Sequence, residues 1–379
     1  MRFAVLLAGL ATLLAISGPA RADTQSDLDL CKFVGAVKNA DESIAACDRV
    51  LKDPKLTATN RAAAFSNRCG WWWAKKDPDR ALTDCNEAIR ADPAYAAAYI
   101  NRGNAYLNKS DFDHAFADFN EAIRLDPKNA WAYAERGNLY KGKGDSEHAL
   151  ADFGQSIRLD PNYAIAYFFR GELYKKNGDY DRAVTDLNES IRLDPNYPMA
   201  YFTRGSVSYT MGNVVASLAD FDASIKLDPN ATTYLSRGVA YFYVGGHVPD
   251  AEADFRKATE LNPTDAYAAL WLDIAARRNN SPSRLAEAAK KLDMTAWPAP
   301  IVRQFLGELN VAQTVSAAAD SDPKTQRGQT CEANFYSGEL ALLKKQKPEA
   351  LRLLKLAAND CPRGFIESTA AIAELISKR

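Results

Sequence analysis

Cysteine and histidine are the residues of this chain best suited to metal binding, redox chemistry or proton transfer. The six cysteines are Cys31, Cys47, Cys69, Cys85, Cys331 and Cys361, and the three histidines are His114, His148 and His247. The cysteines contain no closely spaced pair of the kind that a zinc site uses, so a metal site is the weaker alternative. We expect them to form disulfides, and we expect neither a metal ion nor a bound cofactor.

Arginines and aspartates recur in register along most of the chain. The arginines are Arg68, Arg102, Arg136, Arg170, Arg204 and Arg237, and the aspartates are Asp84, Asp118, Asp152, Asp186, Asp220 and Asp254. Such a ladder could supply catalytic carboxylates, but we favour ion pairs that set the stacking register of neighbouring helices. The sequence leaves open whether each aspartate meets the arginine of its own unit or of the next.

Motifs of known catalytic chemistry are missing from the sequence. It contains no Gly-rich phosphate loop, no His-Glu-x-x-His, no Gly-x-Ser-x-Gly and no Cys-x-x-Cys. We therefore predict a protein that is not an enzyme and has no catalytic residues. A carboxylate pair assembled from distant parts of the chain stays open, because neighbours in space need not be neighbours in sequence.

The first residues have the pattern of a secretory signal peptide. A basic start precedes an apolar run, a helix-breaking Gly-Pro and a site of the Ala-x-Ala type, which predicts cleavage after Ala22. Removing residues 1–22 takes away Arg2 and Arg21 and no acidic residue, which changes the net charge from −1 to −3. An acidic mature chain argues against a nucleic-acid partner. We predict a periplasmic or secreted protein without a membrane anchor.

The elements that position these residues follow a fixed period. Asp-Pro steps begin at residues 92, 126, 160, 194 and 228, and Asn262-Pro263 follows at the same interval of 34 residues. A period of this size indicates stacked repeats, each of which buries its apolar face on its neighbours. Each unit has two stretches of helical periodicity, and the proline ends the second. Each unit is therefore predicted to be a helix–turn–helix.

The unit resembles the tetratricopeptide repeat (TPR), a helix pair of the same length. The matching residues in one unit are Tyr99, Gly103, Tyr106, Ala115, Phe119, Ala122 and Pro127. The resemblance implies an all-α, right-handed superhelical solenoid. We expect the signal peptide at 1–22, a degenerate helical hairpin at 23–61, six TPR units at 62–265, and a C-terminal helical region at 266–379 with a polar loop near 316–330. Gly238 stands one residue early, which predicts a bulged turn in the sequence VGGHVPD that follows it.

The resemblance also implies how the cysteines pair. In the family, the eighth and twenty-fourth places of a unit face each other across the helix pair. Cys69 and Cys85 occupy these places, so we expect a disulfide between them. Cys31 and Cys47 have the same spacing and are expected to pair, which leaves Cys331 for Cys361.

A peptide-binding groove is the functional surface that the resemblance implies. In the family, the first helices of the units line a concave face. The corresponding residues here are Trp73, Ile100, Asn104, Trp131, Asn138, Lys141, Ile165, Phe168, Glu172, Lys175, Met199, Phe202, Tyr209 and Leu235. Apolar side chains with amides beside them suit an extended or helical peptide. The alternative is that these side chains pack against another part of the chain, such as its C-terminal helix.

The end of the chain resembles the C-terminal region of NlpI-type bacterial TPR proteins. The shared residues are Phe335, Tyr336, Gly338, Ala350, Leu354, Ala357, Phe365, Glu367, Ala371, Glu374 and Leu375. Members of that family are envelope adaptors that bring proteases and peptidoglycan hydrolases together. NlpI itself is lipid-anchored, and no cysteine directly follows the predicted cleavage site here. The resemblance implies a periplasmic scaffold, monomeric or homodimeric, that binds protein or peptide partners such as envelope proteases or wall hydrolases.

Two other kinds of function stay open. An enzyme or envelope assembly factor would need a pocket between the repeats and the helices of 266–379, with polar groups that converge there. A self-assembling structural module would form oligomers without any other protein.

Overall fold

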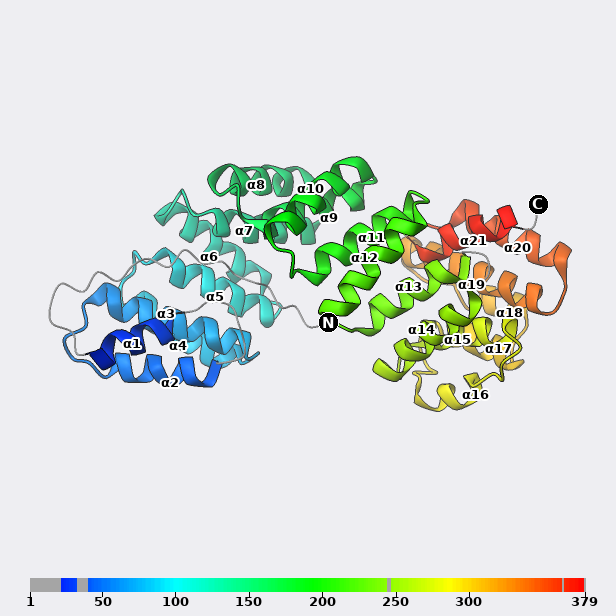
Figure 1. The fold of residues 1–379 in the computed structure, drawn as a ribbon, viewed down its shortest axis with the longest axis horizontal. Coiled ribbons are helices and arrows are strands. Elements are labelled where there is room, and N and C mark those ends of the chain that lie inside the picture. Colours follow the sequence, from blue (N-terminus) through cyan, green and yellow to red (C-terminus); the bar gives the residue numbers. More distant parts are fainter. Residues whose placement is uncertain (1–21, 33–39, 244–246, 363–364, 378–379) are drawn as a thin grey trace. The chain divides into compact units, whose positions relative to one another are not determined.

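The computed structural model describes residues 22–32, 40–243, 247–362 and 365–377, and the regular elements in these ranges are helices (Figure 1). The prediction of an all-α fold is confirmed. The predicted signal peptide lies outside the described residues except for Ala22, as does the start of the predicted bulged turn, residues 244–246. No helix in the described ranges has the length and apolar character that crossing a membrane requires.

The chain divides into two compact units, and each is described by itself. The first comprises residues 1–173 with 192–194, and the second comprises 174–191 with 195–379. The helices of the first unit are α1 (Ala22–Cys31), α2 (Ala40–Leu51), α3 (Ala58–Ala74), α4 (Pro78–Ala91), α5 (Ala96–Asn108), α6 (Phe112–Leu125), α7 (Ala130–Lys143) and α8 (Ser146–Leu159). Residues of α9 (Ala164–Asn177) and α10 (Tyr180–Leu193) belong to both units.

The remaining helices belong to the second unit. They are α11 (Pro198–Thr210), α12 (Val214–Leu227), α13 (Ala231–Tyr243), α14 (Val248–Leu261), α15 (Ala266–Arg278), α16 (Leu285–Ala288), the 3₁₀ helix η2 (Ala289–Lys291), α17 (Ala299–Leu306), α18 (Val311–Ser316), α19 (Pro323–Leu343), α20 (Lys347–Asp360) and α21 (Ile366–Ser377). The polar loop predicted near 316–330 is shorter than expected, because α19 already begins at Pro323. Asp322 caps this helix by accepting a hydrogen bond from the Thr325 N–H at 2.9 Å.

Consecutive helices pair as hairpins within each unit. The pairs are α1 with α2, α3 with α4, α5 with α6 and α7 with α8 in the first unit, and α11 with α12, α13 with α14 and α19 with α20 in the second. The first helices of neighbouring hairpins also contact each other, as α3 does α5 and α13 does both α11 and α15. The first helices therefore lie side by side, which is the arrangement that the predicted groove requires.

Several of the described turns inside hairpins contain one residue with a left-handed backbone. Gly144 has φ 82° and Gly212 has φ 80°, and no atom lies near the place where a side chain would begin. The corresponding residues of two earlier hairpins are Lys76, with φ 61°, and Ser110, with φ 58°. An aspartate, or Asn213 after Gly212, then caps the second helix, as Asp111 does by accepting from the His114 N–H at 3.3 Å.

A glycine facing a large side chain sets the distance between the two helices of a hairpin. A Cβ atom added at Gly103 would lie 2.7 Å from the Phe119 ring, and one added at Gly137 would lie 2.8 Å from Phe153. Gly205 and Gly238 stand in the same relation to Phe221 and Phe255. Only glycine permits this close approach, which explains why the spacing of these residues identifies the repeat.

The same two places hold disulfides at the N-terminal end of the chain. Cys31 pairs with Cys47 across α1 and α2, and Cys69 pairs with Cys85 across α3 and α4. A covalent bond thus replaces the contact between glycine and phenylalanine. The third disulfide joins Cys331 of α19 to Cys361, which follows α20. All three pairs are those expected from the sequence.

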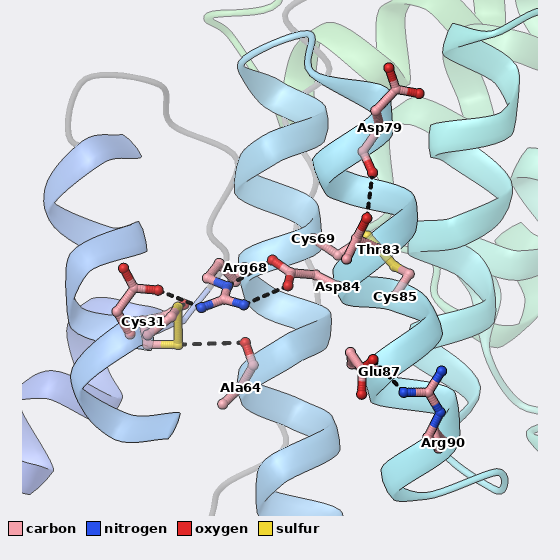
Figure 2. Close-up of polar contacts among 12 residues, drawn as sticks. Cys31, Ala64, Arg68, Cys69, Asp79, Thr83, Asp84, Cys85, Glu87 and Arg90 are labelled. Carbon is pink, nitrogen blue, oxygen red and sulfur yellow. Dashed lines mark hydrogen bonds and ion pairs between the residues drawn. A yellow bond between two sulfur atoms is a disulfide. The ribbon is translucent and has the colours of Figure 1, made fainter. Parts of the chain in front are cut away.

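The charged ladder joins the two helices of a hairpin and also links each hairpin to the one before it. The Arg136 guanidinium donates two hydrogen bonds of 2.8 Å to Asp152 of its own hairpin and one of 2.8 Å to the Asn120 Oδ1 of the preceding hairpin. Arg68 holds Asp84 in the same way (Figure 2). It also contacts Asp48 of the preceding hairpin. Equivalent sets surround Arg102, Arg204 and Arg237. For these five arginines, the aspartate of the ladder belongs to the same unit, and the additional partner, such as Asp48 or Asp222, belongs to the preceding hairpin.

The geometry of the repeat returns in α19 and α20, beyond the units that the period reveals. Gly338 faces Leu354 as Gly103 faces Phe119, with a distance of 2.9 Å from an added Cβ atom to Leu354 Cγ. Lys345 has φ 59° at the turn, as Lys76 and Ser110 have left-handed backbones in earlier hairpins. Cys361-Pro362 takes the place of the Asp-Pro step that closes the other units. The missing aspartate conceals this hairpin from a search based on Asp-Pro.

Candidate peptide-binding surface

The predicted groove residues of the first unit divide into a buried layer and an exposed layer. Ile100, Ile165 and Phe168 are at most 4% exposed, and Asn104 is also buried. These four residues lie beneath the surface. They were predicted to line the groove, but they are buried too deeply to contact a ligand. The side chains that reach the surface are half-buried and lie on the first helices α3, α7 and α9. They are Trp73, Trp131, Asn138, Lys141 and Glu172.

Two of the predicted residues contact each other across neighbouring first helices. The Lys141 ammonium of α7 lies 2.7 Å from the Glu172 carboxylate of α9. The same ammonium lies 4.8 Å from the centre of the Phe169 ring, which is within the range of a cation–π contact. This pair fixes two charged groups of opposite sign at the surface and holds α7 against α9.

Glu135 is a residue of this surface that the sequence analysis missed. Its carboxylate accepts a hydrogen bond of 3.0 Å from Trp131 Nε1, one turn earlier on α7. The side chain is buried, and burial raises the pKa of the Glu135 carboxyl to about 7. A signal was present, because Glu135 is an acidic residue four positions after a predicted groove tryptophan, on the same face of the helix.

The predicted groove residues of the second unit have a different environment. Tyr209 of α11 and Leu235 of α13 pack against a cluster that includes residues of α15, α17, α19 and α21. Phe202 packs on Phe221, with their ring centres 5.9 Å apart. Met199 is half-buried, as is Lys175 of α9. Tyr209 and Leu235 therefore adjoin a core to which α13, α14 and the C-terminal helices all contribute.

Buried charged groups connect these C-terminal helices to the repeats. Arg278 of α15 donates to Glu374 of α21 at 2.6 Å and to Glu339 of α19 at 2.5 Å, and it lies 4.5 Å from the centre of the Phe242 ring. Tyr243 of α13 donates to the same Glu339 at 3.5 Å. Apart from Glu374, which the resemblance matched at the C-terminus, none of these residues was singled out from the sequence, because their spacing follows no period.

A second polar group lies between α15, α19 and α21. Glu332 accepts hydrogen bonds from Tyr267 at 2.7 Å and from Trp297 at 2.6 Å, and Glu367 accepts one from Tyr336 at 3.2 Å. Burial, together with the neighbouring Glu332, raises the pKa of Glu367 to about 7. These carboxylates are hydrogen-bonded to aromatic side chains of the core, so this arrangement serves packing and offers no exposed acid–base pair.

Comparison with known proteins agrees with the repeat geometry. Family models described as tetratricopeptide repeat match residues 96–129, 119–151 and 153–185, and one described as TPR repeat matches 171–212. No curated protein matches the sequence significantly.

Solved structures show the same fold at low sequence identity. The chain is similar to one in the crystal structure of the APC/C hetero-tetramer Cut9–Hcn1, with a TM-score of 0.58 and 16% identity over 74% of this chain and 55% of that one. This chain thus spans about half the length of that relative. It is also similar to Pseudomonas aeruginosa PilF, with a TM-score of 0.50 and 16% identity over 56% of this chain and 96% of that one.

Proposed function

Because the chain carries a tandem array of tetratricopeptide repeats, a fold that serves as a protein-interaction scaffold, we propose that it binds its partners through the first helices of the first unit. The observation that carries this proposal is the exposed layer on α7 and α9. There Asn138 precedes Lys141, which pairs with Glu172, by one turn of α7, and Trp131 precedes Asn138 by two turns on the same face of the helix. An aromatic anchor flanked by an amide and fixed charges suits a peptide that combines an apolar side chain with backbone hydrogen bonds.

The proposed location is the periplasm. The sequence of the leader supports export, with cleavage after Ala22. Three disulfides support it as well, because such bonds persist in oxidising compartments and are rare in the cytosol.

The proposed partners are envelope proteins, and proteases or peptidoglycan hydrolases are the candidates. This part rests on the resemblance of the C-terminal region to NlpI-type adaptors. The matching residues Phe335, Tyr336 and Leu354 belong to the core around α19 and α20. We propose a non-catalytic role, because Glu332 and Glu367 near the C-terminus are hydrogen-bonded to aromatic side chains of the core. We also propose that the chain is a monomer or homodimer.

The test is a capture experiment with residues 23–379 as bait on a periplasmic extract. Asn138→Arg places a long cation on the proposed surface without removing any contact described above. Asn162→Arg makes the same substitution at an exposed turn position and is the matched control. We expect the parent and Asn162→Arg chains to retain the same envelope protein, and Asn138→Arg to lose it. Equal capture by all three folded chains would place the interaction elsewhere and refute the proposed surface.

A further inference from the structure

The last helix, α21, packs against the inner side of the repeats in the second unit. It contacts α13, α19 and α20 (Figure 1). Its Glu374 accepts a hydrogen bond from Arg278 of α15. Arg278 and Tyr243 stand near the C-terminal ends of the first helices α15 and α13, as Lys141 does on α7. In the second unit, α21 therefore lies against α13 and bonds to α15 near the ends of these helices that correspond to the Lys141 end of α7.

The buried positions of α21 are small or charged, and its larger apolar contacts lie near its two ends. Its buried residues are Glu367, Ala370, Ala371 and Glu374, while Ile366 and Leu375 are partly buried against the core. Ile372 and Ile376 point away from the core, with 46% and 64% of their surfaces exposed. The two alanines bury little apolar area, and Ile366 and Leu375 are only partly buried, so the bonds from Arg278 to Glu374 and from Tyr336 to Glu367 contribute to the attachment of α21.

The covalent framework ends before α21. The disulfide between Cys331 and Cys361 ties the end of α20 to α19, and α21 begins only at Ile366. The hairpin of α19 and α20 can therefore keep its structure when α21 leaves. Arg278 would then retain Glu339 as a partner, and Phe242 and Tyr243 of α13 would become more accessible.

We propose that the inner face of α13 and α15 is a helix-binding site that the chain fills with its own α21. A partner helix competes for it by presenting two adjacent small residues and, three positions after the second of them, a carboxylate for Arg278. This inference rests on the proposed function, since it takes the inner face of the repeats as the binding surface. It adds the kind of partner and a built-in competitor.

The test uses the full chain and a fluorescent peptide with the sequence of residues 365–379. Ala371→Arg puts a long cation into the buried side of α21 and is expected to release it. Ile376→Arg makes the same change on the exposed side and is the control. We expect the peptide to bind the Ala371→Arg chain at least about tenfold more tightly than the parent or Ile376→Arg chain. A peptide with Glu374→Gln should bind the Ala371→Arg chain about tenfold more weakly than the parent peptide.

Hydrogen exchange of the α21 amides shows whether the helix has been released, and Glu374→Lys supplies a second variant designed to release it. If the amides stay protected in both variants, the described contacts do not hold α21 and the proposal fails. Failure of the peptide to bind a chain whose α21 is released also overturns it. These outcomes do not involve the envelope partner, so they are independent of the capture experiment with Asn138→Arg.

Discussion

At the scale of the residue, two buried glutamates make the stability of the chain depend on pH. Burial raises the pKa of Glu135 and of Glu367 from 4.5 to about 7. The folded chain therefore binds these protons more tightly than the unfolded chain does. The stabilisation is fully present below pH 4.5, and it is lost as the pH rises through about 7.

Glu367→Gln should remove this dependence at one site. The amide stays uncharged, and its oxygen can still accept the hydrogen bond from Tyr336. We expect the variant to be more stable than the parent at pH 8 by about 2 kcal/mol, and nearly equal to it at pH 4. Urea unfolding at the two pH values measures the difference. A variant that is less stable than the parent at pH 8 would show that the Glu367 carboxylate is better accommodated than its burial implies.

At the scale of the element, the turn between the two helices of a hairpin tolerates some residues better than others. Gly144 and Gly212 adopt the left-handed backbone without cost, whereas Ser110 and Lys345 adopt it against the preference of a residue with a Cβ atom. No atom lies within 4 Å of the Cβ position at Gly144, so the effect of a substitution there is one of backbone conformation alone.

Exchanging residues at these turns should change stability in opposite directions. Ser110→Gly is expected to raise the free energy of unfolding and Gly144→Ala to lower it, each by about 1 kcal/mol. Thermal unfolding of the two single variants beside the parent measures both effects. The same sign for both would contradict the assignment of the strain to backbone conformation.

Sequence reasoning succeeded where one residue type alone fits a place in the hairpin. Gly103 and Phe119 mark the repeat because a side chain at the glycine would overlap the ring. Sequence reasoning failed where the burial of a side chain depends on neighbouring helices. Ile100 and Trp131 both belong to the predicted groove, yet only Trp131 reaches the surface. It also missed Arg278, whose partners lie 61 and 96 residues away.

At the scale of the whole chain, disulfides occur in the hairpins nearest its two ends. A stack of repeats opens from its ends, because a terminal hairpin has a neighbour on one side only. Cys31–Cys47 and Cys69–Cys85 secure the first two hairpins, and Cys331–Cys361 secures α19 and α20. The hairpins of α5 with α6 and α7 with α8 pack glycine against phenylalanine instead.

Removing the last disulfide should therefore destabilise one end and spare the middle. We expect Cys331→Ala with Cys361→Ala to lower the local stability of α19 to α21 by about 3 kcal/mol. Hydrogen exchange measured along the chain should show faster exchange there and unchanged rates in α5 to α8. A uniform acceleration through all helices would mean that the chain unfolds as a single cooperative block.

The order of the disulfides along the chain also bears on its biogenesis. Cys31, Cys69 and Cys331 each pair with the next cysteine in the sequence. A chain that emerges N-terminus first into an oxidising compartment can close each bond before a wrong partner has appeared. If the chain is exported as proposed, we expect its maturation to need an oxidant and to depend little on a disulfide isomerase.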